Sequence, residues 1–223
     1  MNRMPIHKQQ VTPNLIDSVF SEPRNLPGML ITIVGFDASG KTTQCGALAA
    51  RFREAGREVI ETRQPTDWYR NESAVQHFHD EGGSKERARI LSLFAAADRH
   101  RHVQEVILPA LRNGDVVICD RYVYATFGVF VHRGVAPDFL AIINHGVPRP
   151  DSAFFLKVPT PILIDRLRQR DVNNLKFEER SPDRIESITS IYQQMGDQLV
   201  TINGTQSADA VTDQMWSVCM AKR

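Results

Sequence analysis

Short apolar runs alternate along the chain with longer stretches in which apolar residues recur at helical spacing. Buried strands are predicted for the apolar runs at 29–34, 57–63, 115–120, 152–158 and 198–203. Helical spacing predicts helices at 43–55, 85–112 with a break near Pro109, 162–170, 184–199 and 207–223. This alternation favours an α/β fold in which a mostly parallel, five-stranded sheet lies between two layers of helices.

The chain before the first predicted strand has a different character. Residues 1–28 contain four prolines and only a short helical stretch at 15–20. A chain of 223 residues with 42% hydrophobic content is long enough for one sizeable core. We therefore interpret residues 1–28 as an N-terminal extension and residues 29–223 as one domain.

Composition argues against several classes of function. The net charge is +1 with both signs interspersed, so no nucleic-acid surface is indicated. No stretch of about 18 apolar residues occurs, and the first 28 residues lack the apolar centre of a secretory signal. Cys45, Cys119 and Cys219 match no disulfide or zinc spacing, which is typical of the reduced thiols of a cytoplasmic protein.

The segment GFDASGKTTQ at 35–44 joins the first predicted strand to the first predicted helix and fits the pattern G-x-x-x-x-G-K-[ST]. Its glycines let backbone N–H groups point at phosphate oxygens, and the helix adds its positive dipole. We expect Lys41, in a solvent-filled loop, to reach the β- and γ-phosphates of a nucleoside triphosphate and Thr42 to bind Mg²⁺. The residues predicted to cradle the triphosphate are Gly35, Ala38, Ser39, Gly40, Lys41, Thr42 and Thr43.

The third predicted strand ends in a carboxylate followed by a cation, in ICDRY at 118–122. Strand ends of a parallel sheet share one edge, so Asp120 is expected to act on the Mg²⁺ and Arg121 to bind a phosphate. Arg63 ends the second strand, and Arg99 lies on the long helix. Several guanidinium groups near a triphosphate site suggest a second anionic substrate, because arginine pairs well with phosphate.

Six segments occur in an order and spacing that resemble thymidylate kinases, at 35–44, 62–65, 94–111, 116–124, 149–159 and 176–179. The resemblance covers nearly the whole chain from Met29 onward. It implies transfer of the γ-phosphoryl group of ATP to a pyrimidine deoxynucleoside monophosphate, with Mg²⁺, by a homodimer. In that scheme Asp37 holds the sugar hydroxyl of the acceptor, Arg63 and Arg121 grip its phosphate, and Arg99 meets the pyrimidine. The full substrate-binding set that it implies is Asp37, Arg63, Phe94, Arg99, Arg121 and Thr126.

Phosphoryl transfer also requires positive charge beside the migrating group beyond that of Lys41. Some thymidylate kinases place an arginine inside the phosphate loop, where this chain has Asp-Ala-Ser at 37–39. A lid segment at about 168–180 offers Arg168, Arg170, Lys176 and Arg180 instead. We expect Arg170 and Lys176 to be catalytic together with Lys41 and Arg121.

The half of the site that would hold sugar and base departs from the family pattern. Val129 and Phe130 stand where relatives have a tyrosine and a glutamine, and Gln64 replaces a glutamate. The stacking phenylalanine of relatives corresponds to Ala95, with Phe94 one residue earlier and about 100° away around a helix. Three functions therefore stay open: a thymidylate kinase, a related enzyme for a ribonucleotide or modified pyrimidine, and a nucleotide-binding regulatory protein without kinase activity. The retained cradle and acceptor clamp favour an enzyme.

Three other features are expected to be structural. His77, His79 and Asp80 are not expected to bind zinc, because positions i and i+2 do not share a helix face. The histidines at 100–102 are expected in an exposed helix turn. Phe154 and Phe155 are expected in the core of a buried strand.

Overall fold

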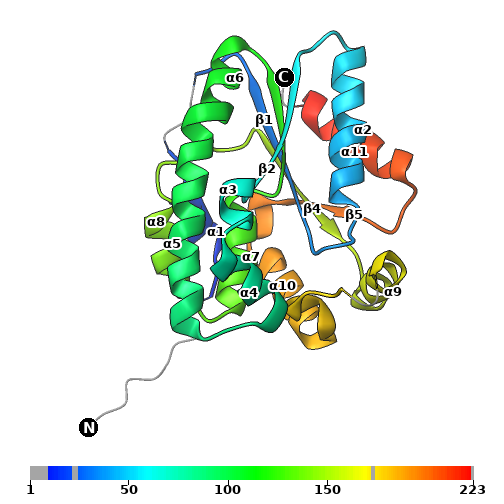
Figure 1. The fold of residues 1–223 in the computed structure, drawn as a ribbon. Coiled ribbons are helices and arrows are strands. Elements are labelled where there is room, and N and C mark those ends of the chain that lie inside the picture. Colours follow the sequence, from blue (N-terminus) through cyan, green and yellow to red (C-terminus); the bar gives the residue numbers. More distant parts are fainter. Residues whose placement is uncertain (1–9, 22–24, 172–173, 222–223) are drawn as a thin grey trace.

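Five parallel strands form the centre of the protein (Figure 1). The computed structural model describes residues 10–21, 25–171 and 174–221. The strands are β1 (Met29–Val34), β2 (Val59–Arg63), β3 (Val116–Asp120), β4 (Ser152–Lys157) and β5 (Val200–Asn203), in the order β2-β3-β1-β4-β5. The predicted strands and the parallel sheet are confirmed, with each observed strand lying within a predicted run.

The central strand β1 shows why the strands read as continuous apolar runs. Ile31 and Ile33 are fully buried against one layer of helices, and Leu30 and Val34 against the other. Successive side chains of a strand point to opposite faces, so a strand covered on both faces needs apolar residues at every position. The sheet therefore separates two hydrophobic cores.

Helices cover both faces of the sheet (Figure 1). One face carries α2 (Lys41–Glu54) and α11 (Ala208–Ala221), which contact each other and the sheet. The opposite layer is built mainly from α5 (Lys85–His102), α6 (Leu108–Asn113), α7 (Val123–His132), α8 (Pro137–Ile143) and α10 (Pro182–Gln194). The remaining elements are α1 (Pro13–Asp17), α3 (Asp67–Arg70), α4 (Ser73–Glu81), η1 (Val103–Ile107), α9 (Thr160–Asp171), η2 (Phe177–Arg180) and η3 (Gly196–Gln198).

The predicted break in the long helix is present, but it begins before Pro109. A π-helical turn, η1, separates α5 from α6. Pro109 has no backbone N–H, and its ring would clash with the carbonyl four residues earlier, so the preceding turn widens. Gly114 then ends α6 in a left-handed conformation with φ 90°.

Helices α3, α4, α7 and α8 were not predicted. α7 is buried at most of its positions, so it has no polar face from which a helical period could be recognised. Its position matters for function, because it directly follows the strand-end Arg121.

Residues 10–21 of the predicted extension lie against the domain. Ile16 of α1 is fully buried, and Phe20 forms a β-bridge with Val147. The Phe20 ring also lies 5.8 Å from the ring of Tyr124 on α7. This part of the extension therefore belongs to the hydrophobic core, while residues 1–9 lie outside the described residues.

Candidate active site

The loop between β1 and α2 has the backbone geometry of a phosphate cradle. Gly40 caps α2 with φ 98°, a conformation that favours glycine. A Cβ on Gly35 would lie 2.7 Å from Ser39 Oγ and 2.9 Å from the carbonyl oxygen of Leu156, so only glycine fits. The loop is closed tightly, with its N–H groups at the start of a 14-residue helix.

Lys41 is buried, and the expectation of a solvent-filled loop was wrong. Its side chain is 6% exposed, and Nζ donates a hydrogen bond of 2.8 Å to the carbonyl oxygen of Phe36. Burial, followed by the nearby charge of Arg121, lowers the pKa of Lys41 to about 8, although Asp37 opposes the shift. The lysine is buried because the Phe36 carbonyl, which belongs to the same loop, lies over its amine.

Thr42 and Asp120 meet at the start of α2 and the end of β3. Thr42 Oγ1 donates a hydrogen bond of 2.9 Å to Asp120 Oδ2. The other carboxylate oxygen, Oδ1, is buried without a hydrogen-bond partner among the described residues. A hydroxyl beside a carboxylate with one free buried oxygen is a donor set that suits Mg²⁺.

Asp37 lies at the centre of a charge cluster. It forms a close ion pair with Arg121, and its carboxylate oxygens lie 3.2 Å from Lys176 Nζ and 3.7 Å from Lys41 Nζ. Burial alone would raise the pKa of Asp37, but the charges of Arg121, Lys41 and Lys176 hold it well below its usual range. Asp37 is therefore ionised at neutral pH.

Arg121 holds an uncommon backbone conformation. Its φ is 68°, which a residue with a long side chain rarely adopts. Its N–H donates a hydrogen bond of 2.9 Å to the carbonyl oxygen of Ile33 on β1, and Asp37 fixes the guanidinium. The sheet edge and the phosphate loop thus together hold Arg121 in place, as is common where geometry serves a site.

A cavity of about 520 Å³ opens beside this cluster. It brings together most of the predicted site: Asp37, Ala38, Gly40, Lys41, Thr42, Thr43, Arg63, Asp120, Arg121, Thr126, Arg170 and Lys176. Gly35 and Ser39 lie close to each other within the loop and do not line the cavity. The cavity therefore joins the phosphate loop to the residues that were predicted to hold the acceptor.

Arg70 is a cavity residue that the sequence analysis missed. It ends α3, and its Nε donates a hydrogen bond of 2.7 Å to the carbonyl oxygen of Pro65. Burial, and then the charges of Arg121 and Arg63, lower the pKa of Arg70. Three guanidinium groups thus face one part of the cavity. Only the order of the short elements after β2 brings Arg70 there, and no motif marks it.

Arg99 and Phe94 do not line the cavity. Arg99 is 1% exposed, and its guanidinium donates to Asn144 Oδ1 at 2.9 Å and, at close range, to Gln64 and Thr126. It therefore reaches the cavity only through Thr126. The Phe94 ring lies against Trp68 and Tyr69, at 4.7 and 5.6 Å between centroids. Its one-residue offset on α5 directs it to this outer side.

The predicted lid lies partly outside the described residues, at 172–173. Within the described part, Arg170 contacts Glu179 at 3.0 Å and Lys176 reaches Asp37. Arg168 and Arg180 do not line the cavity. Arg166, which the sequence analysis missed, donates to the carbonyl oxygens of Ala38 and Gly204 at 3.4 and 3.3 Å.

The histidines are placed differently from expectation. His102 is 4% exposed and hydrogen-bonds to Thr62 and Gln64 at 2.8 and 2.9 Å, so the prediction of an exposed turn was wrong there. Thr62 lies in β2 and Gln64 directly follows it, and these polar partners replace water around the buried ring. His79 lines the cavity, whereas His77 is exposed beside Glu81. Phe154 and Phe155 are buried in β4, as predicted.

An α/β/α fold with this loop between its central strand and α2 defines a P-loop nucleotide-binding protein. The family model of thymidylate kinase matches residues 33–215. A probable thymidylate kinase of Pyrococcus horikoshii is 40% identical over 64% of this chain and 71% of its own length. The thymidylate kinases of Methylococcus capsulatus and Xanthomonas euvesicatoria are 35% and 33% identical over 74% and 87% of this chain, and 76% and 84% of their own lengths. The chain belongs to the thymidylate kinase family and is a nucleoside monophosphate kinase.

Two further findings concern the described residues. None of their helices is long and apolar enough to cross a membrane. The thiols of Cys45, Cys119 and Cys219 are free and buried.

Proposed function

We propose that the protein transfers the γ-phosphoryl group of ATP to a pyrimidine nucleoside monophosphate, thymidylate first of all, in a reaction that depends on Mg²⁺. The observation that carries the proposal is the position of Asp37 and Arg121. Their ion pair joins the phosphate loop to the cavity wall that Arg63 and Arg70 also line. A donor on the loop and an anionic acceptor in the cavity would then meet at this junction.

In the proposed reaction, an oxygen of the acceptor phosphate attacks the γ-phosphorus, and the bond from that phosphorus to the bridging oxygen breaks. ADP leaves with the bridging oxygen, and the acceptor becomes a diphosphate. Mg²⁺, held by Thr42 and Asp120, would neutralise negative charge on the donor phosphates. Lys41 supplies a fixed cation on the loop side, and Arg121 orients the acceptor phosphate.

Asp37 organises these cations before substrates bind. It holds Lys41, Arg121 and Lys176 around one carboxylate, although three like charges repel one another. Lys176 and Arg170 come from the lid side, so they can complete the site when the lid lies over the phosphates. Preorganised charges of this kind stabilise a transition state without reorganisation during the reaction.

The polar wall around Thr126 supports a pyrimidine as the acceptor base. Because Arg99 donates to Thr126 Oγ1, that hydroxyl has its own hydrogen free to donate into the cavity. A carbonyl oxygen of the base would accept it. One observation favours a different or modified nucleotide: Val129, in place of the larger tyrosine, lines the cavity.

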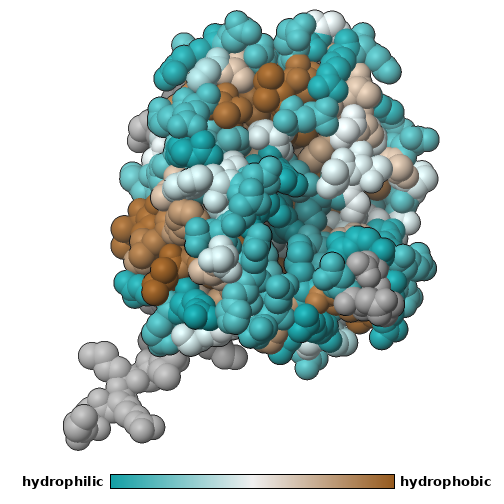
Figure 2. All heavy atoms as spheres, viewed as in Figure 1, coloured by the Kyte–Doolittle hydropathy of each residue, from teal (hydrophilic) through white to brown (hydrophobic). Residues whose placement is uncertain are grey.

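We also propose a homodimer that forms through α5 and α8. Ile90 and Leu93 on α5 are 65% and 47% exposed, and Ile142 on α8 is 74% exposed. Figure 2 shows apolar surface gathered over this side of the molecule. Sedimentation velocity of the wild type and of the Ile90→Asp/Leu93→Asp variant tests the proposal. If both the wild type and the variant sediment as monomers, the proposal is overturned.

The free buried thiols support a reducing, cytoplasmic setting.

A coupled assay of ADP release with a panel of nucleoside monophosphates tests the catalytic proposal. We expect turnover with thymidylate that requires Mg²⁺ and that is lost in Lys41→Ala. Turnover with another monophosphate but not with thymidylate would identify the protein as a related kinase for a different or modified nucleotide. Nucleotide binding without ADP release on the whole panel would identify the regulatory protein and contradict the proposal.

A further inference from the structure

A tyrosine that lines the cavity has a buried hydroxyl that donates to no acceptor in the described part of the chain. Tyr192 on α10 is 1% exposed and lines the cavity. Its hydroxyl donates a hydrogen bond to no acceptor among the described residues. Buried polar groups are nearly always paired, and an unpaired one lowers stability. A phenylalanine would fill the same space without that cost, so the hydroxyl calls for an explanation.

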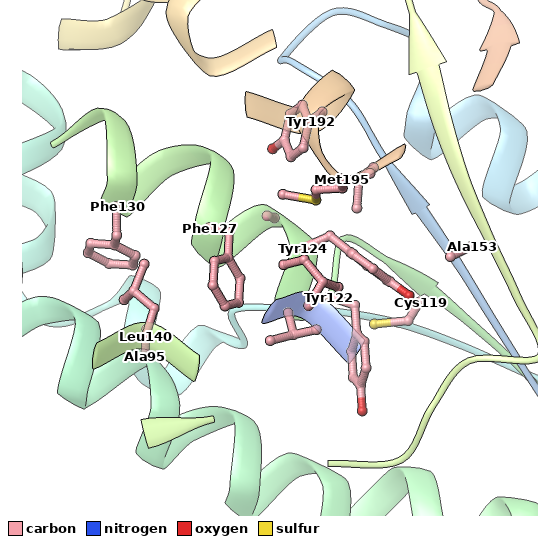
Figure 3. Close-up of a cluster of buried hydrophobic side chains, with 14 of the residues drawn as sticks. Ala95, Cys119, Tyr122, Tyr124, Phe127, Phe130, Leu140, Ala153, Tyr192 and Met195 are labelled. Atoms are coloured by element: carbon pink, nitrogen blue, oxygen red, sulfur yellow. The ribbon is translucent and has the colours of Figure 1, made fainter. Parts of the chain in front are cut away.

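The ring of Tyr192 is held firmly in position. It extends from α10 over α7 in Figure 3, and its centroid lies 5.3 Å from that of Phe155 in the sheet. Gly128 in the middle of α7 makes room for it. A Cβ at residue 128 would lie 2.6 Å from Cε1 of the ring and 3.0 Å from the hydroxyl oxygen. Glycine inside a helix is unfavourable, which suggests that this close approach has a use.

The surroundings of the hydroxyl favour an anionic partner. Burial raises the pKa of Tyr192 to about 12, so the hydroxyl keeps its proton and remains a donor. Arg121 is the charged group that acts on this pKa most strongly, followed by Asp37, and its guanidinium can also donate to the hydroxyl oxygen, which leaves the hydroxyl hydrogen without an acceptor among the described residues. Asp37 is already bound by Arg121, Lys176 and Lys41. A phosphate held by Arg121 would therefore be the natural acceptor for this hydrogen bond.

We propose that the Tyr192 hydroxyl donates a hydrogen bond to the phosphate of the bound monophosphate, beside Arg121, and that Gly128 positions the ring for this contact. The inference rests on the proposed function, because it assumes a monophosphate in this cavity. It adds a neutral donor from α10 to the guanidinium groups of β2, α3 and the end of β3. A neutral donor fixes the direction of a phosphate oxygen without adding to the repulsion among the arginines.

The test is Tyr192→Phe, which keeps the ring and removes only the hydroxyl. We expect the KM for thymidylate to rise about tenfold or more, because a hydrogen bond to a charged group is lost. The KM for ATP should stay within about twofold, and Tm should change little, since the hydroxyl donates to no acceptor in the described part of the protein. Tyr124→Phe is the matched control, because Tyr124 is buried on α7 outside the cavity wall. It should leave both KM values unchanged.

A binding measurement with thymidine identifies the group that the hydroxyl contacts. Calorimetry should show Tyr192→Phe weakening thymidylate but not thymidine, which lacks the phosphate. An unchanged KM for thymidylate in Tyr192→Phe would overturn the inference, and an equal loss of thymidine affinity would overturn the phosphate contact. Failure of the proposed function would look different, because the wild-type enzyme itself would then release no ADP with any monophosphate.

Discussion

At the scale of single residues, Lys41 combines burial with a required charge. Its side chain is 6% exposed, and its amine donates a hydrogen bond to the carbonyl oxygen of Phe36, which holds it at the loop. Transition-state theory gives the expected size of its effect on the reaction rate. A preorganised cation at a developing charge contributes about 3 kcal/mol or more, which is about a hundredfold in rate.

We therefore expect Lys41→Ala to lower kcat at least about a hundredfold. Folding should survive, because removing the lysine also removes the cost of burying its charge beside Arg121. Steady-state kinetics and a circular-dichroism melt measure the two effects. Lys157→Ala, at an exposed strand end, is the control. Turnover near the wild-type rate on every accepted monophosphate would contradict the role assigned to Lys41.

His79 makes stability depend on pH. Burial, and then the charges of Arg133 and Lys176, lower the pKa of His79 to about 4, with Glu178 opposing and Arg70 adding to the shift. Its usual value in an unfolded chain is about 6.5. Between these values the unfolded chain binds the extra proton, so the free energy of unfolding falls as pH falls.

We expect His79→Gln to reduce this dependence between pH 6.5 and about 4, by at most about 1.4 kcal/mol per pH unit. Part of the slope should remain, because burial also lowers the pKa of His102 and His132. Urea unfolding at several pH values measures the effect. His77→Gln, on the exposed side of α4, is the matched control. Identical slopes for the wild type and His79→Gln would refute the assignment.

At the scale of elements, the ends of β2 and β3 carry two of the arginines proposed to bind the acceptor phosphate. Arg63 is the last residue of β2 and Arg121 follows the neighbouring β3, with Arg63 in register with Asp120. Both line the cavity beside Arg70. Parallel strand ends bring these side chains to one edge of the sheet, whereas the phosphate loop follows β1.

Arg63→Ala and Arg121→Ala should each raise the KM for the monophosphate more than about tenfold, with a much smaller change in the KM for ATP. If the clamp tightens in the transition state, kcat should fall as well. Initial rates over a matrix of both substrates measure this. Arg51→Ala is a control, since Arg51 pairs with Asp213 on α11 instead. A raised KM for ATP with an unchanged KM for the monophosphate would mean that the donor and acceptor sites are reversed.

The N-terminal segment packs against α7. Phe20 is 6% exposed, contacts Tyr124 and lies 4.5 Å beneath the guanidinium of Arg149. Truncating a buried phenylalanine costs about 3–5 kcal/mol, so Phe20→Ala should lower the urea midpoint clearly. Asn14→Ala, on an exposed turn of α1, should have little effect. Equal midpoints for both variants would show that the segment does not stabilise the domain.

The elements that the sequence predicted have a clear period or composition. The inner strands β1, β3 and β4 are buried at nearly every position, so they appear as almost continuous apolar runs, and α2 is bounded by glycines. α7 is different, because burial on all sides removes the polar face that would reveal a helix. α3 and α4 are short, and their helical state depends on contacts with α5 and η2 that no local pattern records.

At the scale of the whole molecule, the placement of the phosphate loop in the cavity was predictable, and the placement of the other cavity residues only in part. The phosphate loop is local in sequence, so its spacing alone defines its geometry. Arg70 on α3, His79 on α4 and Arg133 just after α7 reach the same cavity. Their meeting depends on the path of the chain between β2 and α8, and the burial of Arg99 depends on partners at 64, 126 and 144. Such long-range packing leaves no signature in spacing.

The choice of acceptor is a property of the assembled cavity. Val129 lines it, at the position where the resemblance implies a tyrosine, and Phe94 lies against Trp68 outside it. Phe130 also lines the cavity and can refill part of the space, whereas Phe127 is fully buried in the core. Exclusion of a 2′-hydroxyl should therefore be weaker than in relatives. Loss of ring stacking should also reduce the preference for thymine, because stacking contributes about 0.5–1.5 kcal/mol.

We expect measurable activity on a ribonucleotide or a 5-substituted pyrimidine monophosphate, with kcat/KM closer to that for thymidylate than the family pattern implies. The measurement is kcat/KM for thymidylate, uridylate and deoxyuridylate with one enzyme preparation. Val129→Tyr is the matched variant, and it should lower kcat/KM for uridylate while retaining that for deoxyuridylate, because only uridylate carries the 2′-hydroxyl. A pocket that merely tolerates a hydroxyl discriminates by about a hundredfold at most. A wild-type preference for thymidylate above about a thousandfold over both other nucleotides exceeds that limit, and it would show that the cavity is closed around thymidylate.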